Sequence, residues 1–170
     1  EPMGRIKFEF YAKYPDHTGN IGQFSMANEP GMHVPYLYNY AGAAWKTQKR
    51  VRQMLDTWFR HDLMGVPGDE DGGGLTAFAL YSMLGFYPVT PGAPVYSIGS
   101  PVFPEVTIHL TNGNRFTVKA EGVSRRNKYI QSASLNGVRL DKPELDHEVL
   151  MAGGELILQM GERPDKEWGR

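Results

Sequence analysis

The spacing of hydrophobic residues predicts helices in the first half of the chain. In residues 45–61 apolar side chains recur every three or four positions, which indicates an amphipathic helix. Its charged face comprises Lys46, Lys49, Arg50 and Arg52. Residues 34–44 have a Pro at their second position and repeat Tyr and Ala every four positions, which predicts another helix. Residues 75–86 are apolar almost all round, so this third predicted helix should be buried on most sides.

From residue 89 onward the pattern takes the period of a strand. Short alternating or β-branched runs cover residues 95–98, 105–110, 115–120, 129–135 and 155–160. TNGN at residues 111–114 and NG at residues 136–137 are typical hairpin turns, and Phe116 and Val118 should face inward. Helices followed by strands predict an α+β fold whose second half is a small antiparallel β-sheet or sandwich.

The stretch PVTPGAP, between the last predicted helix and the first of these strands, has the composition of a short linker. We therefore divide the chain into a helical segment, residues 1–90, and an antiparallel β region, residues 91–170. The linker is short, so the two parts should pack closely together.

Composition removes several classes of protein. The 170 residues include no Cys, which excludes disulfides, thiol catalysis and Cys-ligated zinc. The formal net charge is −1 and the charges are interspersed, so no nucleic-acid partner is indicated. No apolar run approaches the ~20 residues that a membrane span needs. The first residues also lack the hydrophobic region of a signal peptide.

The stretch GVPGDEDGGG, residues 65–74, is the strongest candidate for chemistry. Three successive acids, Asp69, Glu70 and Asp71, lie between glycines in front of the third predicted helix. A fold does not need such a cluster, because neighbouring carboxylates repel one another. Two aspartates two positions apart can share the work of a base, one taking a proton from water while the other orients it, and Glu70 then points away. The same residue types also form ordinary turns and N-caps, and that interpretation stays open.

Two other motifs match this loop in part. An EF-hand beginning at Asp69 would have Gly73 at position five, where an oxygen ligand belongs, and Leu80 at position twelve instead of Glu. The EF-hand is therefore excluded. The Asp-x-Asp motif of nucleotide-sugar transferases fits Asp69 and Asp71, but no βαβ alternation surrounds it. A carboxylate base fits the loop better.

A second polar segment, NEPGMH at residues 28–33, precedes the first predicted helix. Asn28 and Glu29 offer groups that bind sugar hydroxyls, or oxygen ligands for Ca²⁺. Glu29 ahead of a proline-started helix also fits a simple capping role. The aromatic residues that follow should be mostly core, although an aromatic ring near a polar loop can stack on a sugar; these are Tyr36, Tyr38, Tyr40, Trp45 and Trp58.

Three long segments closely resemble the C-terminal part of glycoside hydrolase family 92. They are NEPGMHVPYLYNYAGAAWKTQKRVR at residues 28–52, GVPGDEDGGGLTAFALYSMLGFYPVTPGAPVYSIGSPVF at residues 65–103, and YIQSASLNG at residues 129–137. The resemblance implies a Ca²⁺-dependent, inverting exo-α-mannosidase, commonly specific for α-1,2 linkages. It also implies helices from the end of an (α/α)₆ barrel followed by C-terminal strands.

The resemblance also implies roles for individual residues. By position, Asp71 corresponds to the base that activates water, and Asp69 to the aspartate that supports it. Asn28 and Glu29 match an Asn-Glu-Pro segment whose glutamate lies at the −1 sugar subsite and its calcium, so Glu29 is implied as substrate contact and Ca²⁺ ligand. His33 lies where the family often has two adjacent histidines and is the remaining candidate sugar contact.

One part of the family's machinery has no counterpart in the sequence. An inverting glycosidase needs a general acid about 6.5–9.5 Å from its base. The family supplies it from an earlier barrel segment resembling Glu-Gly-Asn-Ala-Trp, and this motif does not occur here. We therefore expect a C-terminal fragment of an enzyme for mannose-containing glycans, inactive when alone.

The same resemblance bears on partners and location. Helices from an incomplete barrel would expose apolar faces, so we expect contact with a missing N-terminal part of the enzyme, or self-association. The family implies a periplasmic or secreted protein. A non-catalytic Ca²⁺- or carbohydrate-binding module is the alternative function.

Overall fold

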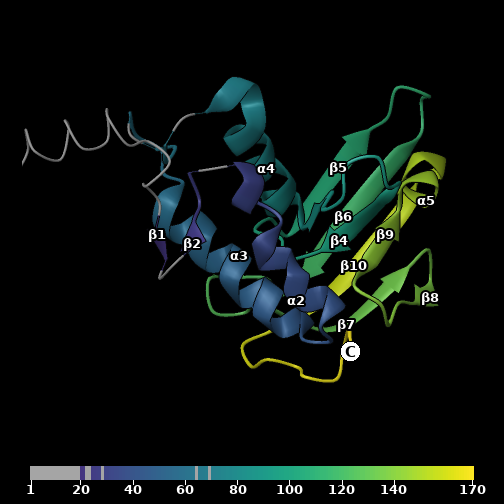
Figure 1. The fold of residues 1–170 in the computed structure, drawn as a ribbon. Coiled ribbons are helices and arrows are strands. Elements are labelled where there is room, and N and C mark those ends of the chain that lie inside the picture. Colours follow the sequence, from purple (N-terminus) through teal and green to yellow (C-terminus); the bar gives the residue numbers. More distant parts are fainter. Residues whose placement is uncertain (1–19, 22–23, 28, 64, 69) are drawn as a thin grey trace, which may run out of the picture.

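The computed structural model describes residues 20–21, 24–27, 29–63, 65–68 and 70–170. Two predicted site residues, Asn28 and Asp69, lie outside these ranges. Within them the longer helices lie on one side of the molecule and the main sheet on the other (Figure 1). In the described part of the chain, no helix is both long and apolar enough to cross a membrane.

The helical side begins with a small antiparallel ribbon and a series of short turns. In chain order its elements are β1 (Asn20–Ile21), β2 (Phe24–Ser25), η2 (Glu29–Gly31), η3 (Val34–Tyr36), α2 (Leu37–Tyr40) and α3 (Ala44–Trp58). The helix predicted for residues 34–44 is therefore interrupted, because Gly42 adopts a left-handed φ of +64° between α2 and α3. The helix predicted from residue 45 is confirmed as α3.

The third predicted helix is α4 (Gly74–Leu84), which ends at Gly85 with a φ of +104°. The sequence pattern extends it to residue 86, but Phe86 already belongs to a strand, β3 (Phe86–Tyr87). β3 pairs with β4 (Val95–Ile98), and β4 pairs with β9 (Glu144–Asp146), both antiparallel. The short helix α5 (His147–Ala152) follows β9 directly.

The main sheet has five strands in the order β5-β6-β10-β7-β8. Their bounds are β5 (Glu105–His109), β6 (Arg115–Glu121), β7 (Tyr129–Leu135), β8 (Val138–Arg139) and β10 (Gly154–Gly161). The predicted α+β fold is confirmed. One pair, β6 and β10, is parallel rather than antiparallel, which is possible because a long stretch of chain separates the two strands.

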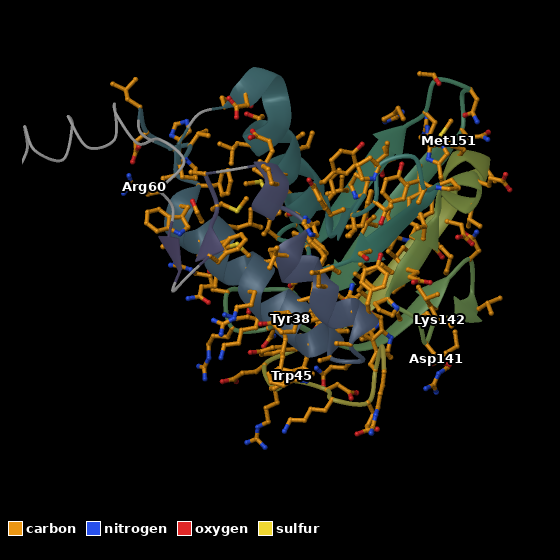
Figure 2. All side chains as sticks on the ribbon, viewed as in Figure 1. Tyr38, Trp45, Arg60, Asp141, Lys142 and Met151 are labelled. Atoms are coloured by element: carbon orange, nitrogen blue, oxygen red, sulfur yellow. The ribbon has the colours of Figure 1, made fainter. Side chains whose placement is uncertain are left out.

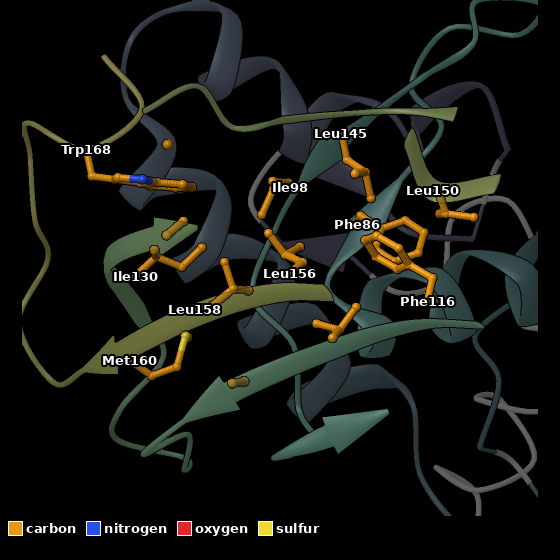
Figure 3. Close-up of a cluster of buried hydrophobic side chains, with 14 residues drawn as sticks. Phe86, Ile98, Phe116, Ile130, Leu145, Leu150, Leu156, Leu158, Met160 and Trp168 are labelled. Carbon is orange, nitrogen blue, oxygen red and sulfur yellow. The ribbon is translucent and has the colours of Figure 1, made fainter. Parts of the chain in front are cut away.

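Two separate hydrophobic clusters form the core. The sheet cluster includes Phe86, Ile98, Phe116, Val118, Ile130, Leu145, Leu156, Leu158 and Trp168. Phe116 and Val118 are buried, as their alternation along β6 predicts. In Figure 3 the two phenylalanines lie at one end of this cluster and Trp168 at the other. The helical cluster comprises Met26, Met32, Tyr36, Val51, Met54, Leu55, Leu75, Phe78 and Ala79. The boundary between residues 90 and 91 stays a prediction.

Polar side chains of the helices join the two sides by binding backbone groups near the strands. Asn39 Nδ2 donates to the carbonyl of Ile98 at 2.9 Å, and Gln48 Oε1 accepts from the amide of Ile130 at 3.1 Å. Such bonds remove the cost of leaving buried backbone groups without partners.

Arg52 makes a third link of this kind. Its guanidinium donates to the carbonyls of Pro101 at 2.8 Å and Ser124 at 3.1 Å. The prediction that Arg52 lies on the charged outer face of α3 is therefore wrong, since the residue is only 3% exposed. A long side chain with several donors can be buried here because two carbonyls receive them. Burial lowers the pKa of Arg52, while the charge of Asp56 acts in the opposite direction.

The five aromatic residues expected to be mostly core fall into different environments. Tyr36 is fully buried and Trp58 packs against the helical cluster, but Tyr40 is 56% exposed. Tyr38 and Trp45 lie at the α2–α3 corner, at the opposite end of α3 from Arg60 (Figure 2). The ammonium group of Lys46 lies 5.6 Å and 5.4 Å from the ring centroids of Tyr38 and Trp45. These two rings therefore contact a cation at the surface.

Candidate functional site

The acid loop leads into α4 through a short turn, η4 (Asp71–Gly73), with Glu70 as the N-cap residue. The Glu70 carboxylate accepts hydrogen bonds from the backbone N–H groups of Gly73 at 2.5 Å and Thr76 at 3.2 Å. These bonds satisfy donors that the start of a helix leaves without partners. Hydrogen bonds from Thr76 are the main cause that lowers the pKa of Glu70, with a further contribution from Gly73. The middle acid of the cluster is thus an ionised helix cap.

Asp71 has a different environment from its neighbour. Its side chain is exposed, and among the described residues it accepts no hydrogen bond. Its backbone φ is +50°, which is uncommon for a residue other than glycine. Gly72 and Gly73 also have positive φ, and apart from their chain neighbours no atom of the described residues lies within 4 Å of where a Cβ on either would stand. The loop therefore presents an exposed carboxylate beside uncrowded backbone, which a ligand can approach closely.

Glu29 reaches the same helix entrance from η2. A Cβ built on Gly74 would stand 2.8 Å from Glu29 Oε1, so the carboxylate lies against the first residue of α4. The N-terminal end of a helix favours a negative charge at this place. Nearby, a side chain at Gly68 would collide with Ala27. The two polar segments that the sequence singles out separately are therefore adjacent in the structure.

Tyr87 is a neighbour of this site that the sequence interpretation missed. Its hydroxyl donates to Met32 Sδ at 3.8 Å, and its ring stacks on Tyr36 with a centroid distance of 5.2 Å. Burial raises the pKa of Tyr87, and the nearby charge of Glu29 raises it further. The sequence pattern gives Tyr87 no role, since the third predicted helix ends at residue 86. Its place two residues beyond the glycine that ends α4 was the available indication of a polar group at the edge of the core.

His33 makes no contact of this kind with the acid loop in the described part of the chain. It is partly buried in front of η3, where its carbonyl accepts from Tyr36 N at 3.0 Å and its side chain makes no capping bond. Among the described residues, no hydrogen bond or ion pair links His33 to the acid loop. Its neighbour Met32 is 3% exposed and belongs to the helical cluster. The structure thus brings together Glu29, Glu70 and Asp71, whereas His33 makes no such link.

The side chains that could bind a metal ion were predicted to include Glu29. Within the described ranges, no group of three or more His, Cys, Asp or Glu side chains is arranged to hold a metal ion. Ca²⁺ takes about six to eight oxygen ligands, and carboxylates are among those it prefers. Glu29 therefore fits as one ligand, and the described side chains do not complete a coordination shell.

Known proteins resemble this chain over nearly its whole length. The sequence pattern of the family described as "Glycosyl hydrolase family 92 catalytic domain" matches residues 5–162. A protein of Arthroderma benhamiae described as an uncharacterized secreted glycosidase is 35% identical over 169 residues. That match covers 98% of this chain and 21% of the relative.

Solved structures give the same result. A family GH92 α-mannosidase from Bacteroides thetaiotaomicron, in complex with mannoimidazole, superposes with a TM-score of 0.88 at 33% identity, over 92% of this chain and 20% of that one. A family GH92 inverting mannosidase from the same species gives a TM-score of 0.83 at 42% identity, over 89% and 20% of the two chains. This chain spans about a fifth of the length of these relatives. Because the family pattern covers nearly all of it, the chain belongs to glycoside hydrolase family 92.

Proposed function

We propose that this chain is part of an inverting α-mannosidase acting on terminal α-1,2-linked mannose, and that it supplies the loop with the general base. The observation that carries the proposal is the meeting of Glu29 with the loop of Glu70 and Asp71 at the entrance of α4. Solved relatives described as α-mannosidases support the substrate class. A relative described as secreted supports a periplasmic or secreted location.

The environments of the two described acids favour Asp71 as the base. Both oxygens of Glu70 already accept backbone hydrogen bonds, so this carboxylate is engaged in the fold. Asp71 is exposed and accepts a proton from a water molecule as the water oxygen attacks the anomeric carbon. Asp69 orients that water. A general acid about 6.5–9.5 Å from the base protonates the leaving oxygen, and it comes from a part of the enzyme beyond this chain.

The residues of the second polar segment bind the mannose ring in this proposal. Asn28, Glu29 and His33 contact the sugar at the −1 subsite, and Glu29 would give one carboxylate oxygen to Ca²⁺. A bound Ca²⁺ orients the substrate and polarises its oxygen atoms. The position of Glu29 against the helix entrance supports a role in which its carboxylate is fixed near the base loop.

Exposed apolar side chains on the short helices suggest how the enzyme is completed. Val34, Leu37 and Tyr40 recur every three residues along η3 and α2 and are 41%, 43% and 56% exposed. Leu80 is also 56% exposed on α4. We propose that these side chains pack against the remainder of the catalytic domain, since relatives are about five times as long. In isolation the same surface would drive self-association.

The test measures mannose release from α-1,2-mannobiose by the whole enzyme that contains this chain. We expect the Asp71→Asn variant to lower kcat by about 10²- to 10⁴-fold, because the carboxylate that accepts the proton is gone. NMR of the first-formed product should show the β-anomer, as inversion requires. The 170-residue chain alone should release no mannose.

Asp146→Asn is the matched control, since it removes an exposed aspartate at the β9–α5 corner, away from the loop. It should leave kcat unchanged. If Asp71→Asn keeps nearly full activity, the assignment of the base is wrong. Mannose binding without any turnover by the whole protein would instead favour a non-catalytic carbohydrate-binding module.

A further inference from the structure

The side chain of Glu70 closes the turn around Asp71 more tightly than the backbone does. The backbone bonds from Gly73 N and Leu75 N to the carbonyl of Glu70 are 3.4 Å and 3.5 Å long. The bonds to its carboxylate are 2.5 Å from Gly73 N and 3.2 Å from Thr76 N. Hydrogen bonds to a charged acceptor are also about twice as strong as neutral ones. The Glu70 carboxylate is therefore the main constraint that bridges this turn.

The turn needs such a constraint because its backbone is unusual. Three successive residues, Asp71, Gly72 and Gly73, have φ values of +50°, +67° and +113°. Glycine reaches these values easily but loses more backbone freedom than other residues when it is fixed in one of them. For Asp71 the left-handed conformation is itself unfavourable and persists only where surrounding contacts impose it. Beyond their chain neighbours, no atom of the described residues lies within 4 Å of where a Cβ on Gly72 or Gly73 would stand, so packing at these positions does not impose it.

We propose that Glu70 is a positioning residue for Asp71, and that its bonds to Gly73 and Thr76 hold the aspartate in its left-handed conformation with the carboxylate exposed. This inference rests on the proposed function, in which Asp71 is the base. Under this proposal the three acids have different roles. Glu70 sets the shape of the loop while the aspartates act on water.

The whole enzyme with Glu70→Ala should lose about 10- to 100-fold in kcat, the scale expected when a reacting group is misplaced by about 1 Å. KM should change by less than about threefold, because the sugar contacts remain. The Tm should also fall, because a helix cap is lost. Glu70→Gln keeps one acceptor oxygen and should give an intermediate kcat. Thr76→Val removes the hydrogen bond of the threonine side chain but keeps the amide donor, so it should lower kcat less than Glu70→Ala.

The Asp71→Asn background separates positioning from stability. There Glu70→Ala should cause no further loss of kcat, because the base it positions is already gone, while the Tm should fall as in the wild type. If Glu70→Ala lowers the Tm but leaves the kcat of the folded wild-type enzyme unchanged, Glu70 only caps the helix and the inference is overturned.

Failure of the proposed function would look different. The wild type would then release no mannose, or Asp71→Asn would have no effect on release. A crystal structure of the Glu70→Ala variant, which lacks both acceptor oxygens, would still decide the structural half of the inference. In that structure Asp71 should have a φ different from +50° or should adopt more than one conformation. An unchanged loop would refute the role given to Glu70.

Discussion

Two turns of this chain have similar positive φ values but different side-chain partners. In the β7–β8 hairpin, Asn136 and Gly137 have φ values of +50° and +79°. In the acid loop, Asp71 and Gly72 have φ values of +50° and +67°. The Asn136 amide oxygen accepts from the backbone N–H of Glu155 at 2.8 Å, whereas the Asp71 carboxylate accepts from no described residue. Both turns have a polar residue in the left-handed region followed by glycine. In the hairpin the polar side chain binds the backbone, whereas in the acid loop it is an exposed carboxylate that can act in catalysis.

The side-chain bond is therefore what distinguishes a structural turn from a candidate site. Asn136 also donates its own backbone N–H to the carbonyl of Glu155 at 2.9 Å, so the hairpin is tied to β10 by both backbone and side chain. In the acid loop the side chain that accepts backbone hydrogen bonds is that of the preceding residue, Glu70. Because Glu70 caps the helix, the carboxylate of Asp71 is not needed for capping and can take part in catalysis.

Asn136→Ala should be the most damaging change in the hairpin. It leaves the Glu155 N–H without its acceptor and puts a residue that disfavours the left-handed region at φ +50°. We expect a loss of about 1–3 kcal/mol in the free energy of unfolding, measured by urea denaturation. The kcat of the folded enzyme should not change, in contrast to Asp71→Asn. A parallel fall in kcat would show that the two turns do not differ in function.

The comparison also shows what the sequence could predict. The NG hairpin turn, the strands β4, β5, β6, β7 and β10 and the inward side of β6 follow from local pattern and turn chemistry alone, whereas the short strands β3, β8 and β9 were not predicted. The acid loop was identified because three adjacent acids have no packing purpose. The role of Glu70 as the helix cap could not be predicted, since its hydrogen bonds form only where α4 begins.

Other features depended on contacts between residues far apart in the chain. Arg52 reads as a surface residue of an amphipathic helix, and only the carbonyls of Pro101 and Ser124 explain its burial. The parallel pairing of β6 with β10 is likewise absent from any local pattern. Glu29 meets the loop through Gly74, 45 positions later in the chain, and the family resemblance rather than spacing connected the two.

Alanine in place of the glycine of each pair tests whether the two backbones are equivalent. Gly72→Ala and Gly137→Ala both place a Cβ at positive φ, and in the part of the chain that the structure describes neither new methyl group would come within 4 Å of an atom beyond its chain neighbours. We expect similar losses of about 1 kcal/mol each in the free energy of unfolding, because the cost is conformational. Urea denaturation of the two variants side by side measures this. Costs that differ several-fold would mean that one turn is held more rigidly than the other.

The smallest expected effect is the pH dependence of the cap. The folded-state pKa of Glu70 is lowered by its hydrogen bonds, chiefly those from Thr76. Its contribution to stability is therefore fully present above the ordinary glutamate pKa of about 4.3 and is lost as the pH falls through the lowered folded value. Glu70→Gln cannot ionise, so the Tm difference between wild type and variant should be largest near neutral pH and shrink below about pH 4. Glu148→Gln removes a charge from the first turn of α5 and serves as the control. A Tm difference for Glu70→Gln that stays constant from pH 7 to pH 3 would mean that the carboxylate caps the loop without its charge, and the acid loop would then resemble the neutral hairpin more closely than its hydrogen bonds indicate.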